Sequence, residues 1–198
     1  MSDKKDYIQR CLAPLANKDN PNRAVLADLR RGLGEFPHIL PRMYRHVQPY
    51  LPDYARWGWH QQAHYLTSSL FALHPYILEY DEDDEEDKRK KKYLNLGDHF
   101  GQITREERLA GRDTETIERR FTHLLSAHPD DLHFHLRQAI TFLSSKNSEM
   151  KVNWSQLLRD IQDWNDPDSR AKVQERWASQ FWQAPKSDEE DQTIETNE

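Results

Sequence analysis

Two histidines, His60 and His64, come nearest to a catalytic motif in this sequence. They stand at i and i+4 in HQQAH, so a helix would place both imidazoles on one face as half of a zinc site. Zinc hydrolases with this spacing use a glutamate at the second position as general base, a role that Gln61 cannot fill. Because no third ligand follows at a supporting spacing, we expect no metal, no cofactor and no catalytic residue.

Arginines on the outer faces of several predicted helices indicate a different chemistry, the binding of phosphate. Arg119 and Arg120, for example, share a predicted helix with Phe121 but lie off its apolar stripe. A single surface arginine is usually only solvated, whereas recurrence across several elements favours contact with a nucleic-acid backbone. The candidate nucleic-acid-binding residues are Arg30, Arg31, Arg119, Arg120, Arg137, Lys146 and Arg159.

The net charge of −6 conceals a basic folded region. Two acidic runs, residues 79–87 (EYDEDDEED) and 187–198, hold fourteen acidic residues and no basic one, which leaves 20 acidic residues against 28 basic ones elsewhere. Acidic runs are usually solvated and mobile. We therefore expect a mobile charged insertion at about 79–92, where KRKKK follows the first run, and a disordered acidic tail at 186–198.

Helix signals recur along the rest of the chain and define the elements that must position these side chains. Asn20-Pro21 and Asp166-Pro167 combine a capping residue with proline in the first turn, and TREE at 104–107 has the spacing of a capping box headed by Thr104. Further helix starts are expected at Asp53, at Asp113 or Thr114, and at Asn153.

Apolar residues follow these starts at spacings of three and four, the pattern of helices with one buried face. Val173, Trp177 and Phe181 are one such stripe, and no run alternates with the period of a strand over a convincing length. The sequence therefore predicts an all-α fold, a helical bundle of about eight or nine helices within residues 1–185. It is built either as one bundle or as two packed lobes divided by the charged insertion.

The composition also indicates the cellular compartment of the protein. A single cysteine, Cys11, excludes an internal disulfide framework, and no apolar stretch approaches the length of a membrane span. The first residues, MSDKKDYIQRC, lack the apolar segment of a secretion signal. We therefore expect a cytoplasmic protein that does not bind a membrane.

Seven segments of the chain are its most distinctive motifs: AVLADLRRGLG (24–34), HQQA (60–63), NLG (95–97), ERRF (118–121), DDLHFHLRQAITFL (130–143), VNWSQLLRDIQDW (152–164) and VQERWASQFW (173–182). In their order and spacing they resemble the CasB-type small subunit of Cascade, the type I-E CRISPR effector complex. The resemblance covers most of the chain outside the insertion and the tail. The sequence departs from the family at Asp98 and Gln138, where basic residues are common.

The resemblance implies a small all-helical subunit without catalytic activity. It implies two copies beside the guide-RNA backbone assembly and the large subunit, with a basic surface that supports the target DNA and the displaced strand of the R-loop. The implied partners are the other Cascade subunits, a second copy of the chain, crRNA and target DNA. The family's basic positions correspond to Arg30, Arg31, Arg119, Arg120 and Arg137, which we expect to form one continuous basic surface.

Two other functions remain open on the residues alone. The arginines could meet acidic surfaces of partner proteins, which would make the chain a protein–protein scaffold without direct nucleic-acid contact. His60 and His64 could instead belong to a metallohydrolase. Salt-dependent binding to single-stranded DNA would separate the first alternative from the leading hypothesis, and the zinc content of the protein would decide the second.

Overall fold

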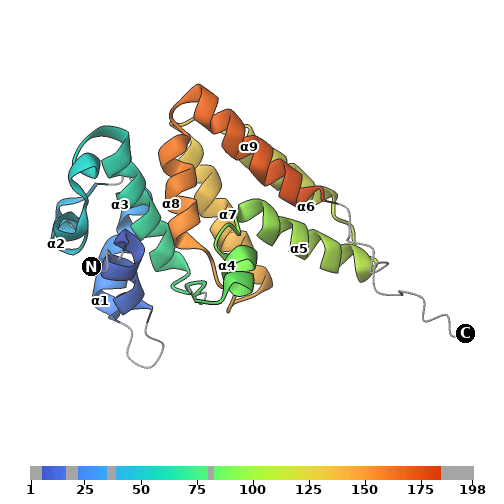
Figure 1. Cartoon of the computed structure of the whole chain (residues 1–198), viewed down its shortest axis with the longest axis horizontal. Helices are drawn as coiled ribbons and strands as arrows, with labels where there is room; N and C mark the ends of the chain where they lie inside the picture. Colours follow the sequence, from blue (N-terminus) through green and yellow to red (C-terminus); the bar gives the residue numbers. More distant parts are fainter. Residues whose placement is uncertain (1–5, 17–21, 35–38, 80–82, 184–198) are drawn as a thin grey trace, which may run out of the picture.

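The computed structural model describes residues 6–16, 22–34, 39–79 and 83–183, and within them the fold is all-α, as predicted (Figure 1). Extended chain pairs in these ranges at one isolated bridge, between Ile77 and Val152. Every described helix is too short or too polar to cross a membrane. The nine α-helices of the described ranges are α1 (Arg23–Arg30), α2 (Pro41–Val47), α3 (Gly58–Leu73), α4 (Glu85–Lys91), α5 (Leu96–Leu109), α6 (Glu115–Leu125), α7 (Leu132–Lys146), α8 (Trp154–Asp163) and α9 (Pro167–Phe181).

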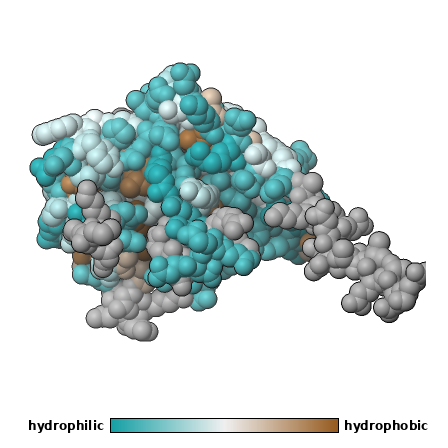
Figure 2. Space-filling model, viewed as in Figure 1, coloured by the Kyte–Doolittle hydropathy of each residue, from teal (hydrophilic) through white to brown (hydrophobic). Residues whose placement is uncertain are grey.

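The helices are arranged around one connected core. Figure 1 shows α1–α3 at one end of the molecule, α5, α6 and α9 at the other, and α7 and α8 between them. Residues 63–72 of α3 are all buried, because this helix packs against α1, α7 and α8 on different sides. Apart from Ala55, the buried apolar residues of the described ranges form a single cluster that extends from Tyr7 to Phe181. The face shown in Figure 2 is mostly hydrophilic, with isolated hydrophobic side chains.

Three of the predicted helix starts are confirmed. Asn153 begins α8, and its side-chain oxygen accepts a hydrogen bond from the backbone N–H of Gln156 (2.9 Å). Asp166 begins α9 in the same way and is followed by Pro167 in the first turn. Thr114 precedes α6. Asn153 and Asp166 each satisfy a backbone N–H that has no partner inside its helix, which is why these residue types start helices.

The start predicted at Thr104 is wrong. Thr104 lies buried inside α5, where its hydroxyl donates a hydrogen bond to the Phe100 carbonyl oxygen (2.8 Å). A mid-helix threonine can make this bond, so the TREE spacing does not by itself mark a helix start. α5 begins instead at Asn95, whose side chain forms a capping box with that of Asp98. Asp98, one of the departures from the family pattern, therefore has a structural role.

Two further starts lie at other residues than predicted. Asp53 belongs to a short 3-10 turn, and α3 begins only after Trp57, which makes no side-chain cap. Asn20 lies outside the described residues, and the cap of α1 is Asn22, whose side chain accepts a hydrogen bond from the Val25 N–H (3.2 Å). Both predictions fell within a few positions of the true boundary, and at α1 the residue type, asparagine, was also correct.

The charged insertion, for which the sequence analysis predicted no helix, contains the helix α4. Asp84 caps it by accepting hydrogen bonds from the first backbone N–H groups. Two ion pairs follow, each between residues about one helical turn apart: Lys88 with Glu85 (3.1 Å) and Lys91 with Asp87 (2.6 Å). The opposite charges thus stabilise a helical turn. The mobility expected for 79–92 stays a prediction, and the tail at 186–198 lies outside the described residues.

α5 and α9 pack closely because two glycines of α5 face α9. A methyl group added at Gly97 would lie 2.1 Å from the backbone carbonyl oxygen of Trp177, far inside van der Waals contact. One turn later, a methyl group at Gly101 would meet the Gln180 carbonyl oxygen at 3.1 Å. Glycine is thus required for the two backbones to come this close, which explains the glycine of the NLG motif.

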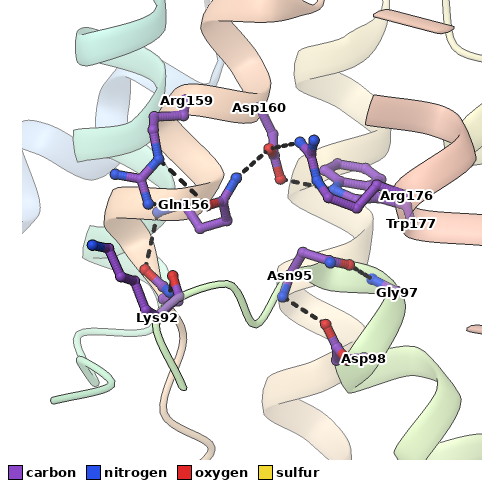
Figure 3. Close-up of polar contacts among 10 residues, drawn as sticks. Lys92, Asn95, Gly97, Asp98, Gln156, Arg159, Asp160, Arg176 and Trp177 are labelled. Atoms are coloured by element: carbon purple, nitrogen blue, oxygen red, sulfur yellow. Dashed lines mark hydrogen bonds and ion pairs between the residues drawn. The ribbon is translucent and has the colours of Figure 1, made fainter. Parts of the chain in front are cut away.

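A buried carboxylate, Asp160 on α8, connects α8 to α9 (Figure 3). Its side chain is 0% exposed, accepts hydrogen bonds from Trp177 Nε1 and Gln156 Nε2 (both 2.7 Å) and forms an ion pair with Arg176. Burial raises the pKa of the Asp160 carboxyl, whereas the Arg176 charge and the hydrogen-bond donors favour its ionised form. A buried charge is tolerated only with such partners, so this network fixes the position of α9 against α8.

We expect Gly97→Ala to destabilise the fold by at least about 2 kcal/mol, because the added methyl group forces the α5 and α9 backbones apart. Urea unfolding followed by circular dichroism measures the change. Gly34→Ala is the matched control, since no heavy atom lies within 4 Å of its added methyl group, and it should change the free energy of unfolding by less than about 0.5 kcal/mol. Equal stabilities of the two variants would contradict the close-packing argument.

The stability should also depend on pH through His99, which is buried in α5. Burial lowers the pKa of His99 to about 4, and the nearby His74 adds to the effect. An unfolded histidine titrates near pH 6.5, so the unfolded chain takes up the proton first. The stabilising contribution is therefore complete above about pH 6.5 and is lost as the pH falls to about 4, by an amount on the order of 3 kcal/mol.

Urea unfolding of the native chain and of a His99→Gln variant over this pH range tests the assignment. The variant should lose less stability on acidification than the native chain, because the titrating ring is gone. His60→Gln, at an exposed position, is the control and should follow the native chain. An identical loss in the His99→Gln variant would show that other groups cause the acid sensitivity.

Candidate nucleic-acid interface

α6 and α7 form a hairpin whose inner faces are buried and whose outer faces line a groove. The turn at 126–131 joins the two helices, and Phe121 on α6 and Ile140 on α7 are fully buried in the core. On the outer faces, positions three and four residues apart come together along the groove. The groove is lined by Thr116, Arg119, Arg120 and His123 from α6 and by Phe134, Arg137, Gln138, Thr141, Phe142 and Ser145 from α7.

Three of the arginines predicted from the sequence meet in this groove. Arg119, Arg120 and Arg137 are all exposed and border a volume of about 720 Å³. Among the described residues no carboxylate forms an ion pair with them, and the adjacent Glu118 pairs instead with Arg108 Nη2 (3.3 Å). A guanidinium group without a carboxylate partner can bind phosphate through two parallel hydrogen bonds. The groove therefore has the chemistry of an anion-binding surface.

Two aromatic rings lie among these cations. Phe142 is partly buried and stacks on Phe100 of α5, with ring centroids 5.4 Å apart. The Arg120 guanidinium lies 5.6 Å from the centroid of Phe142, a cation–π contact that orients it over the groove. Phe134 stands near the start of α7, about two turns before Phe142, and is 53% exposed.

Lys146, another candidate residue, is the last residue of α7. Its Nζ pairs with Glu107 Oε1 (3.0 Å) and lies 5.8 Å from the ring centroid of Phe142. Arg112 also pairs with Glu107, and the hydrogen bonds from Arg112 and Lys146 lower the pKa of Glu107 to about 2. Glu107 is therefore charged at neutral pH and offsets part of the positive charge that Lys146 adds beside the groove.

Arg30 and Arg31 lie outside the groove, on α1 and on the 3-10 turn Arg31–Gly34 that follows it. The Arg30 guanidinium donates two hydrogen bonds to the Ala72 carbonyl oxygen (2.8 and 3.1 Å), near the C-terminus of α3. Arg31 pairs with Asp28 (3.2 Å). The structure thus brings three of the five family-matched arginines into one groove, and the single surface that we expect for all five stays a prediction.

Arg159 on α8 also stands outside the groove. Its Nε and Nη2 donate hydrogen bonds to Gln156 Oε1 (3.3 and 2.9 Å), and Gln156 in turn donates to Asp160 (Figure 3). Arg159 is therefore the exposed end of the network that connects α8 to α9. Its role in nucleic-acid binding stays a prediction.

His60 and His64 differ in their surroundings. His60 is exposed, whereas His64 is fully buried and its Nδ1–H donates a hydrogen bond to the His60 carbonyl oxygen (2.7 Å). Burial lowers the pKa of His64, so the ring is neutral near pH 7. In the part of the chain that the structure describes, no group of three or more His, Cys, Asp or Glu side chains could hold a metal ion.

The sequence reasoning did not assign the other seven residues to the groove, because it considered only cationic side chains as binding residues: Thr116, His123, Phe134, Gln138, Thr141, Phe142 and Ser145. The signal was nevertheless present. On both helices the groove positions repeat at spacings of three and four on the face opposite the apolar stripe. Reading the outer faces as patterns, in the way the core faces are read, would have placed uncharged residues beside the arginines.

Comparison with known proteins finds relatives over most of the chain. The CRISPR-associated protein Cse2 family matches residues 25–182. A CRISPR-associated protein Cse2 of Thermus thermophilus is 31% identical over 172 residues, 84% of this chain and 83% of the relative. The crystal structure of M. ruber CasB has a TM-score of 0.63 at 25% identity and covers 89% of this chain and 93% of its own. A chain of a CRISPR RNA-guided surveillance complex shares the fold, with a TM-score of 0.61, 24% identity and 88% of each chain covered.

The matched region contains the groove helices and the α5–α9 contact, and it confirms the resemblance drawn from the sequence motifs. Both the family match over residues 25–182 and the relative that is 31% identical show that this chain belongs to the Cse2 family of CRISPR-associated proteins, to which CasB subunits belong.

Proposed function

We propose that the chain is a non-catalytic subunit of the type I-E CRISPR complex Cascade, which acts in antiviral defence by holding nucleic acid and stabilising the R-loop. The observation that carries the proposal is the groove between α6 and α7. There Arg119, Arg120 and Arg137 face solvent without a carboxylate partner among the described residues. Membership of the Cse2 family supports the CRISPR setting.

The energetics of an R-loop suit such a surface. Formation of the R-loop exchanges a DNA duplex for an RNA–DNA heteroduplex of nearly equal stability. A few protein contacts with phosphates can therefore shift the balance. The guide RNA reads the sequence, so the subunit gains nothing from base specificity, and arginines contact the backbone of any sequence equally. The two helices fix the backbone positions of these arginines before the nucleic acid binds.

The proposed partners are the other Cascade subunits, a second copy of the chain, crRNA and target DNA. The chain of the RNA-guided surveillance complex that shares this fold supports assembly into a larger particle. Two exposed aromatic residues just before α3, Trp57 (77% exposed) and Tyr54 (64% exposed), are of the kind enriched at protein interfaces. They favour a contact with another protein at the α3 end of the molecule. This observation supports the alternative function, a protein–protein scaffold without direct nucleic-acid contact.

Replacing Arg119, Arg120 and Arg137 together by alanine should weaken R-loop formation by a reconstituted complex. Each contact contributes roughly tenfold or less, and each lost phosphate contact should reduce the slope of log affinity against log salt by about one unit. A salt titration of R-loop formation on two unrelated target sequences measures both quantities. The loss should be the same on both targets, because the contact is to the backbone.

A matched control removes the same charge elsewhere. Arg23, Arg42 and Arg45 are three exposed arginines outside the groove, and their joint replacement by alanine should leave the affinity and the salt slope near native values. If the groove variant assembles and yet forms R-loops with native stability and slope, the nucleic-acid role is rejected and the scaffold is favoured.

Alanine variants of Arg30 and Arg31 should differ in stability, because Arg30 bonds to the end of α3 and Arg31 makes only a surface ion pair. Arg30→Ala removes both hydrogen bonds to the Ala72 carbonyl oxygen and should lower the free energy of unfolding by about 1–2 kcal/mol. Arg31→Ala removes one exposed ion pair with Asp28 and should cost about 0.5 kcal/mol or less. Urea unfolding of the two variants measures the difference, and equal stabilities would show that Arg30 does not cap α3.

A further inference from the structure

Phe134 departs from the pattern of its helix. The apolar residues of α7 at the core face, such as Leu136 and Ile140, are 0% exposed, whereas Phe134 is 53% exposed. A single exposed apolar side chain on an ordinary surface needs no explanation. Phe134, however, lines a groove whose other walls are cationic and polar, with Arg137 and Gln138 on the next turn of α7 and His123 on α6.

The ring of Phe134 has fewer neighbouring side chains than the ring of Phe142 and can therefore contact a ligand. Phe142 stacks on Phe100 and is approached by the Arg120 guanidinium and the Lys146 ammonium. Among the described residues Phe134 makes one ring contact, an edge-on contact with His135 at 5.5 Å and 81°. An edge-on neighbour leaves a ring face uncovered. An uncovered phenyl face can stack on a planar aromatic ring.

We propose that Phe134 is a stacking platform for one unpaired nucleobase, in a single-stranded segment whose phosphates lie on Arg119 and Arg137. This inference rests on the proposed function and specifies its ligand as single-stranded nucleic acid. In a duplex the base faces are covered by their neighbours, so a ring on a groove wall has no access to them. Arginines beside an aromatic platform are the combination with which proteins hold single strands without sequence preference.

The geometry assigns different tasks to the two kinds of side chain. Arg119 and Arg137 come from different helices, so a strand along the groove would meet cations on both walls, and Phe134 precedes Arg137 by about one turn on the same helix. The cations supply the salt-dependent part of the affinity. The ring supplies a part that depends on the presence of bases and little on salt.

The test compares two ligands of the full-length chain, a short oligodeoxythymidylate and an abasic oligonucleotide of the same length. The native chain should bind the strand with bases roughly five- to one-hundredfold more tightly, because stacking operates on that strand alone. Phe134→Ala should bring the ratio close to about one and leave the salt slope unchanged. Phe134→Trp, which keeps an aromatic face, should keep the preference. An oligouridylate of the same length tests whether the site also takes RNA.

Two controls make the outcomes separable. Phe134→Leu keeps an apolar side chain without an aromatic face, so retention of the base preference in this variant would overturn stacking. A joint Arg119→Ala and Arg137→Ala variant should weaken binding of both oligonucleotides equally and flatten the salt slope.

If the native chain binds both oligonucleotides equally with a steep salt slope, this inference fails and the proposed function stands. If it binds neither, both fail. Circular dichroism verifies that each variant is folded.

Discussion

The close contact between α5 and α9 at Gly97 determines where the groove helices lie. Gly97 lets the α5 backbone approach the carbonyl oxygen of Trp177, and the two helices then present Phe100 and Phe181 to α6. Phe121 of α6 stacks on Phe181 at 4.3 Å and packs against Phe100 at 5.2 Å. The arginines next to Phe121 in the sequence thus reach the groove from a helix whose inner face is fully packed. A larger residue at Gly97 would displace this support and move the groove wall with it.

Cationic residues of the same type have different roles in this fold because their neighbours differ. Arg176 pairs with a buried carboxylate and connects two helices, and Arg30 binds the end of α3. Lys146 shares Glu107 with Arg112 beside the groove. The groove arginines have no such partner among the described residues, and this difference, more than their number, makes them the candidate binding surface.

The groove combines properties that a sequence-independent support for nucleic acid needs. Its side chains stand on two packed helices, so the backbone that carries them does not have to be ordered when a strand binds. One cation, Arg120, is oriented by the ring of Phe142, which is itself held by Phe100. The salt-dependent attraction and the apolar ring surface lie side by side, so the proposed affinity has an electrostatic part and a part that salt does not screen.

The sequence by itself determined the all-α class, the apolar stripe of α9, the starts of α6, α8 and α9, and the family. These follow from interactions within a few residues, namely helical periodicity and capping, or from motifs in order. The tertiary structure alone decided the start of α5 at Asn95, the contact of Gly97 with α9, and the assignment of the arginines to caps, ion pairs or the groove. Spacing along one helix shows which side chains share a face, but which distant carbonyl or carboxylate meets that face depends on how the helices pack.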